Sequence, residues 1–222
     1  MYVQRTFSSV TYQDGRQMTL RSLIPVLYDV PISGRNDIDS LLGGRKWGAA
    51  LGLGVSLTYS FPEGDPAYPD DYGINEAIEW MAGWQTLDAP LRTAFRDALN
   101  HIASFIPVSF TETAESFDIV GDLRFAASNY LESRDSPPAA YAYYPGQSAA
   151  GGDVWLNPSS FFETDVAPLT WRYSSILHEL GHSLGLTHPS EGESISGTTL
   201  PTGPQGTDNL FYTIMSYTED PS

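Results

Sequence analysis

The sequence predicts an α+β domain with five short strands and two main helices in a chain of 222 residues. Two patterns carry this prediction. Five segments are short apolar runs or alternate apolar with polar residues, whereas two longer segments repeat apolar residues at helical spacing. Hydrophobic residues make up 41% of the chain, which is ample for one core. We therefore expect one domain, or one domain with a small extension.

The predicted strands lie between residues 55 and 156. The first, at 55–61, alternates four apolar side chains with serine and threonine, as a half-buried strand does. The other four patterns are shorter and cover residues 108–111, 119–125, 141–144 and 153–156.

A long helix is predicted between the first two strands. Asp88 and Pro90 suit a helix start, because aspartate caps free N–H groups and proline fits the first turn. The apolar residues that follow share helical spacing and predict a packed stripe: Leu91, Ala94, Phe95, Ala98, Leu99, Ile102 and Phe105. His101 lies off this stripe, so we expect a surface or structural histidine.

The second helix is predicted around HELGHSLGLTHP, residues 178–189. His178 and His182 are four residues apart, so a helix aims both imidazoles from one face at a point about 2 Å away. Apolar residues can anchor the opposite face in the core: Ile176, Leu177, Leu180 and Leu184. Gly185 suits the left-handed turn that ends such a helix, and His188 beyond it adds a third nitrogen.

Three histidine ligands predict a catalytic zinc site. They leave a fourth position for water, and a cysteine-rich structural zinc site is excluded because the chain has no cysteine. Glu179 is the expected general base, taking a proton from the zinc-bound water and delivering it to the leaving amine. A core helix with two hydrogen-bonded histidines has the same HExxH pattern, so this short motif alone leaves a structural role open.

A second motif, TIMSY, ends at Tyr217. HExxHxxGxxH followed by a methionine turn is the metzincin pattern, and the chain is similar to this clan of zinc endopeptidases. Pro189, after the third histidine, and Tyr217, two residues after Met215, resemble the serralysins, which are secreted bacterial proteases. Matrix metalloproteases share the zinc motif, but a cysteine in their propeptide usually keeps them inactive, and this chain has no cysteine. Upstream segments similar to serralysins, in the same order, are 38–48, 57–62, 140–146 and 152–157.

The resemblance implies a zincin-like catalytic domain of the M10 peptidase type, with a twisted, mostly parallel five-stranded sheet and an antiparallel edge strand. That edge strand, near residues 140–144, would align an extended peptide by backbone pairing. Met215 would form a Met-turn beneath the zinc, and Tyr217 would bind the zinc displaceably or hydrogen-bond the tetrahedral intermediate. Ordinary packing roles for both residues stay open. The loop at 189–207 is either a wall of the substrate pocket or a passive surface loop.

Two features depart from the serralysin pattern. The chain stops seven residues after Met215, where a metzincin domain normally adds a helix, and glycine-aspartate calcium repeats are absent from it. We expect the natural product to continue, or another segment to cover this surface. Residues 1–35 match no family segment and are expected to be an N-terminal extension, with a pro-segment as one interpretation. Residues 36–222 are expected to form the catalytic domain.

The formal net charge is −16, from 27 acidic and 11 basic residues. This charge opposes binding to nucleic acid, which needs clustered lysine and arginine. No apolar run is long enough for a membrane span, and the serralysin resemblance implies secretion. We expect a monomer. Acidic loops are candidate calcium sites, with plain solvated surface as the alternative: Asp65, Asp70, Asp71, Asp118 and Asp122.

These observations predict a zinc-dependent endopeptidase, a hydrolase that cuts extended segments of protein substrates. Two alternatives stay open. One is a narrow-specificity or autoprocessing peptidase module of a larger protein, suggested by the abrupt C-terminus. The other is a metal-binding domain of the same fold without turnover, against which the presence of Glu179 argues. Cleavage preference and physiological substrate do not follow from the sequence.

Overall fold

The structure is a computed structural model that describes residues 10–11, 17–18, 25–66, 68, 72, 78–81, 83–116, 119–203 and 205–219. Its helices are α1 (Asn36–Asp39), α2 (Ile78–Met81), α3 (Ala89–Ala103), α4 (Pro158–Phe161) and α5 (Trp171–Leu184), with a 3₁₀ turn at Leu131–Ser133. The strands outside the main sheet form two pairs, β1 (Val10–Thr11) with β2 (Gln17–Met18) and β3 (Leu27–Asp29) with β4 (Arg45–Trp47).

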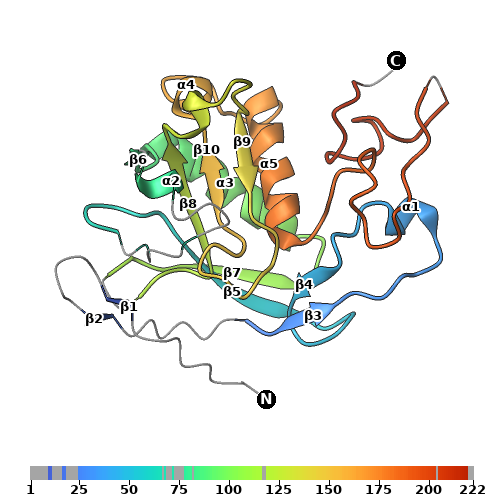
Figure 1. Ribbon diagram of the computed structural model, residues 1–222, viewed down its shortest axis with the longest axis horizontal. Coiled ribbons are helices and arrows are strands. Elements are labelled where there is room, and N and C mark those ends of the chain that lie inside the picture. The colour runs from blue at the N-terminus through green and yellow to red at the C-terminus, as the bar shows by residue number, and fades with distance from the viewer. Residues whose placement is uncertain are drawn as a thin grey trace.

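The main sheet has the order β7-β5-β8-β10-β9 (Figure 1). Its strands are β5 (Val55–Ser60), β7 (Val108–Glu112), β8 (Leu123–Ser128), β9 (Ala140–Ala142) and β10 (Val154–Leu156). Neighbours pair in parallel except β9, which is antiparallel to β10. The predicted mostly parallel sheet with an antiparallel edge strand is therefore confirmed. A two-residue strand that was not predicted, β6 (Trp84–Gln85), also pairs antiparallel with β8.

The third predicted strand begins later than its apolar pattern suggested, at Leu123 instead of residue 119. The reason is a side-chain contact just before it. The Asp122 carboxylate accepts hydrogen bonds from the backbone N–H and the hydroxyl of Thr58, at 2.7 and 2.8 Å. Strand pairing to β5 starts only after this contact, at Leu123.

The sheet buries a different core on each face, because successive side chains of a strand point to opposite sides. Val154 and Leu156 join the main core with α3 and α5, whereas Trp155 between them joins a second cluster with Tyr68 and Tyr72. The two main helices contact each other and cover the same face of the sheet (Figure 1). The layered α+β arrangement thus places α5 directly against the edge half of the sheet.

Helix α3 begins as predicted, since the Asp88 side chain caps it by accepting from the N–H of Leu91 at 3.0 Å. Its end differs from the prediction. The helix stops at Ala103, and Phe105 is 65% exposed, so its place in the packed stripe was wrong. Pro107 gives the reason, because a residue before proline avoids the helical conformation. His101 is exposed, with its ring edge against Phe105.

Of the candidate calcium ligands, Asp122 is engaged by Thr58 and Asp65 is exposed. Asp70, Asp71 and Asp118 lie outside the described residues. Among the residues that the structure does describe, no helix has the length and apolar character needed to cross a lipid bilayer.

The packing of α3 generates the first testable prediction. Phe95 is fully buried and stacks on Phe125, with ring centroids 4.4 Å apart and planes 14° apart. We expect Phe95→Ala to lower the free energy of unfolding by about 3–5 kcal/mol, through lost burial and the cavity left behind. Phe105→Ala is the matched control, and as an exposed substitution it should change the value by less than about 0.5 kcal/mol. Urea unfolding measures both, and equal effects would contradict the observed helix end.

Candidate active site

Helix α5 presents one face to the core and the other to the candidate site. The Thr170 hydroxyl caps it by accepting from the N–H of Tyr173 at 3.2 Å. Ile176 and Leu180 are fully buried among the side chains of the main core. His178 and His182 are one turn apart on the other side, and both are buried as well. Core packing therefore fixes the orientation of both imidazoles.

The chain leaves α5 through a left-handed turn at Gly185, as the sequence predicts. Gly185 has a φ angle of +112°. The N–H of Leu186 donates to the Gly181 carbonyl at 2.9 Å, and the N–H of Gly185 donates to the His182 carbonyl, also at 2.9 Å. These two bonds form a Schellman motif. A Cβ atom at Gly185 would lie 2.2 Å from the Arg45 carbonyl oxygen, so glycine is required for close approach as well as for φ.

An N-terminal strap, residues 41–47, binds the chain that follows α5. The carbonyls of Leu41 and Leu42 accept from the N–H groups of Thr187 and Ile195, both at 2.9 Å. Within the same strap, the Gly43 N–H bonds the Gly185 carbonyl at 2.8 Å. The strap thus holds both ends of the loop that carries His188.

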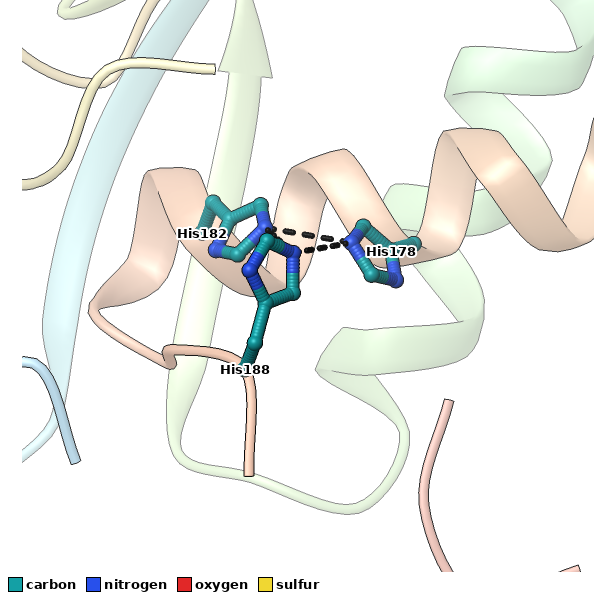
Figure 2. A group of neighbouring side chains, drawn as sticks. All are labelled: His178, His182 and His188. Atoms are coloured by element: carbon teal, nitrogen blue, oxygen red, sulfur yellow. Dashed lines mark hydrogen bonds between the residues drawn. The ribbon is translucent and has the colours of Figure 1, made fainter. Parts of the chain in front are cut away.

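These elements bring the three predicted imidazoles together (Figure 2). The Nε2 atom of His178 lies 3.1 Å from those of His182 and His188, and the latter two are 2.9 Å apart. The three rings come from one helix face and the loop beyond it, and their Nε2 atoms face a common point.

The opposite nitrogen of each ring shows which tautomer is present. The Nδ1 atoms of His178 and His182 lie 2.8 Å from the carbonyl oxygens of Ile214 and Leu186, and that of His188 lies 2.7 Å from a Glu191 carboxylate oxygen. These oxygens only accept, so every Nδ1 carries the hydrogen. Burial also lowers the pKa of His178, and that of His182 to about 3, which keeps these two rings neutral. The Nε2 lone pairs of His178 and His182 therefore face each other without a hydrogen between them.

Converging lone pairs fit a bound cation. A tetrahedral zinc ion with Zn–N bonds of about 2.0–2.1 Å separates its nitrogen ligands by about 3.3 Å, a few tenths of an ångström more than observed here. Small ring rotations close that difference. Three imidazoles with their Nδ1 atoms engaged and their Nε2 atoms turned to one point are a donor set that zinc prefers, so the three histidines can hold this metal.

Glu179 lies beside the first histidine with its carboxylate buried. Within the described part of the chain, its Oε2 atom has no hydrogen-bond partner. Burial raises the pKa of this carboxyl group to about 8. This raised pKa favours the protonated form near neutral pH, and the positive charge of a cation held by the histidines would favour the carboxylate form that a general base needs.

Met215 and Tyr217 approach the histidines from the C-terminal segment. Met215 is fully buried, and a Cβ atom added to Gly181 would meet its sulfur at 2.5 Å, so the two segments touch closely. The Tyr217 ring packs on His178 and His188, with centroids 5.4 and 4.5 Å away. Although 69% of Tyr217 is exposed, partial desolvation and nearby carboxylates raise its pKa to about 12, so its hydroxyl stays a donor.

Besides the Leu186 carbonyl, three neighbours of the imidazoles were not expected from the sequence. The Tyr144 ring packs edge-on against His182 at 5.4 Å, and its hydroxyl donates to the Thr187 hydroxyl at 3.1 Å. The Ile214 carbonyl receives the His178 hydrogen, a contact that sequence does not signal because any residue has a carbonyl. The sequence does carry a signal for Glu191, because this acidic residue follows His188 by only three positions.

Comparison with known proteins identifies the family. A family model described as matrixin, of peptidase family M10, matches residues 79–211, a range that includes the three histidines and Glu179. Similar proteins include a serralysin of Photorhabdus sp. (strain Az29), 27% identical over 72% of this chain and 32% of that protein. Metallopeptidase AprA of Pseudomonas marginalis is 29% identical over 73% and 33%, and serralysin A of Dickeya chrysanthemi is 30% identical over 75% and 33%.

The chain spans about a third of the length of the curated relatives it matches. The family model covers more than half of the chain, and the parallel sheet with its antiparallel edge strand agrees with it. The chain therefore belongs to the matrixin family of M10 peptidases, as a serralysin-like metzincin catalytic domain.

Proposed function

We propose that this protein is a zinc-dependent endopeptidase that hydrolyses peptide bonds of protein substrates. The observation that carries the proposal is the convergence of three Nε2 lone pairs at 2.9–3.1 Å, each on a ring whose Nδ1–H is already engaged. His178, His182 and His188 are the proposed ligands. We assign residues 36–222 to the catalytic domain and treat residues 1–35 as an N-terminal extension, although β3 pairs with β4 across that boundary.

The proposed chemistry divides between the metal and the protein. Zinc held by the three histidines would act as a Lewis acid that polarises the scissile carbonyl and lowers the pKa of water. Glu179 accepts the proton of the attacking water and returns it to the leaving amine, a role supported by its buried Oε2 atom, which has no hydrogen-bond partner among the described residues. Met215 packs beneath the histidines as the methionine of a Met-turn, supported by its contact with Gly181.

Tyr217 is proposed to stabilise the transition state. Its ring packs on two of the three histidines, and its hydroxyl stays protonated at neutral pH. A phenol hydrogen bond to the developing oxyanion is stronger in the transition state than in the ground state. In this proposal the Tyr217 hydroxyl is a hydrogen-bond donor that helps to stabilise the negative charge developing on the scissile carbonyl oxygen.

Extended peptide segments are the proposed substrates. Strand β9 ends the path of the main sheet, next to α5, and its outer edge, which pairs with none of the described strands, offers backbone groups to an added strand. Residues 189–207 are a candidate wall for the side chain after the cut. The serralysin relatives suggest secretion, and the net charge of −16 makes nucleic acid an unsuitable partner.

The metal assignment is tested on protein purified without chelator. We expect near-stoichiometric zinc by elemental analysis, casein hydrolysis that a chelator abolishes and added zinc restores, and loss of both zinc and hydrolysis in His182→Ala. His101→Ala is the matched control, because that histidine lies on α3 and is exposed. If His182→Ala keeps its zinc and its activity, the assignment of the three histidines as the zinc ligands is wrong. Full zinc with no cleavage of casein or a peptide library would instead indicate a metal-binding domain without turnover.

The role of Glu179 is tested by Glu179→Gln. The amide keeps the shape of the side chain but does not accept the proton from water, so we expect turnover to fall about 10²- to 10⁴-fold while zinc content and thermal unfolding stay unchanged. Casein hydrolysis and metal analysis on the same sample give the answer. Turnover within a few-fold of the parent excludes Glu179 as the base.

The role of Tyr217 is tested by Tyr217→Phe. Loss of a donor used in the transition state should lower kcat roughly 10- to 1000-fold with a smaller effect on KM, while zinc stays bound by the histidines. Tyr212→Phe is the control, since Tyr212 is also exposed and its described ring contact is with Phe211. Unchanged kcat in Tyr217→Phe at full zinc occupancy would show that this tyrosine only packs.

A further inference from the structure

The three proposed ligands differ in what holds their outer nitrogen. For His178 and His182 the acceptor is a backbone carbonyl, from Ile214 and Leu186. For His188 it is a carboxylate, Glu191 Oε2, at 2.7 Å. A carbonyl is fixed by the path of the main chain, whereas this carboxylate is supplied by one replaceable side chain. The third ligand is therefore the one whose outer hydrogen bond depends on a single side chain, although its ring also packs against Tyr217 and His182.

His188 is also the ligand with the least support from its own element. His178 and His182 project from the regular helix α5, whereas His188 lies in the loop beyond it. The strap fixes the backbone on both sides of His188, at Thr187 and Ile195, but these bonds do not fix the rotation of its ring. Glu191 accepts from the Nδ1–H, so it sets both the tautomer and the direction of the Nε2 lone pair.

A charged acceptor also changes the ligand itself. A carboxylate that accepts from the imidazole N–H makes the opposite nitrogen a stronger base and therefore a better metal ligand. Glu191 is partly exposed, with 43% of its side chain accessible, so it lies at the rim of the site and not in the core. A substitution there leaves the packing of α5 and the sheet intact.

We propose that Glu191 is a positioning residue that holds the His188 ring in its metal-binding orientation and strengthens zinc binding. This inference rests on the proposed zinc site. Outer partners of metal-bound histidines typically contribute 10- to 100-fold in metal affinity, so an effect of this size is expected from Glu191. Glu191 touches neither the metal nor the substrate in this role, and it acts only through His188.

The experiment measures zinc affinity by competition with a chromogenic chelator for the parent and three variants. Glu191→Ala should weaken zinc binding about 10- to 100-fold. Glu191→Gln should lose less, because its amide oxygen still accepts from the Nδ1–H but carries no charge. Glu193→Ala is the matched control. Glu193 is also acidic and exposed, and its carboxylate oxygen lies within 4.8 Å of ligand atoms of His188 and Glu191. It makes no described hydrogen bond to His188, so its removal changes the charge of the loop but not that bond. Its effect should stay below about fivefold.

Three results would overturn the proposal. The first is a Glu191→Ala protein that binds zinc within about fivefold of the parent. The second is an equal loss in Glu193→Ala, which would mean that the negative field of the loop matters and the hydrogen bond does not. The third is a lower unfolding temperature of metal-free Glu191→Ala, which would mean that the side chain only stabilises the loop. A parent protein that binds no zinc would instead refute the proposed function, so the two failures are distinguishable.

Discussion

Nitrogen lone pairs that face one another inside a protein are unfavourable unless a cation lies between them. The chain keeps three of them converged by giving every Nδ1–H a definite acceptor, two of which are main-chain carbonyls. One carbonyl belongs to Leu186, in the turn that leaves α5, and the other to Ile214, next to Met215. The path of the backbone around the site therefore sets the donor geometry, and the rest of the fold serves to fix that path.

Packing brings the two carbonyls to their places. Ile176 and Leu180 anchor α5 in the main core, and full burial of each such side chain contributes about 1.5–3 kcal/mol. The absence of a side chain at Gly181 lets the Met215 sulfur lie against the helix, which brings the Ile214 carbonyl within reach of His178. A buried methionine that binds no metal thus still affects the ligands, because it determines how closely two segments approach.

Periodic patterns in the sequence predicted the five strands on the main path of the sheet and both main helices, because periodicity reports burial directly. Boundaries that depend on single contacts were missed. The start of β8 follows from the bond between Asp122 and Thr58, and the end of α3 from Pro107. The outer acceptors of the imidazoles were beyond prediction where they are carbonyls, since every residue carries one. Glu191 was predictable in principle, because its spacing from His188 suggests contact.

The strap at residues 41–47 links the metal site to the order of folding. The indole N–H of Trp47 donates to the Ser183 carbonyl across 136 residues of sequence, beside the bonds from Leu41 and Leu42 to the His188 loop. Closing loops of this length costs conformational entropy that short-range helix contacts do not cost. The HExxH helix can therefore form before its third ligand is held in place. A fully formed three-histidine site therefore depends on contacts that span most of the chain, and the helix alone does not provide it.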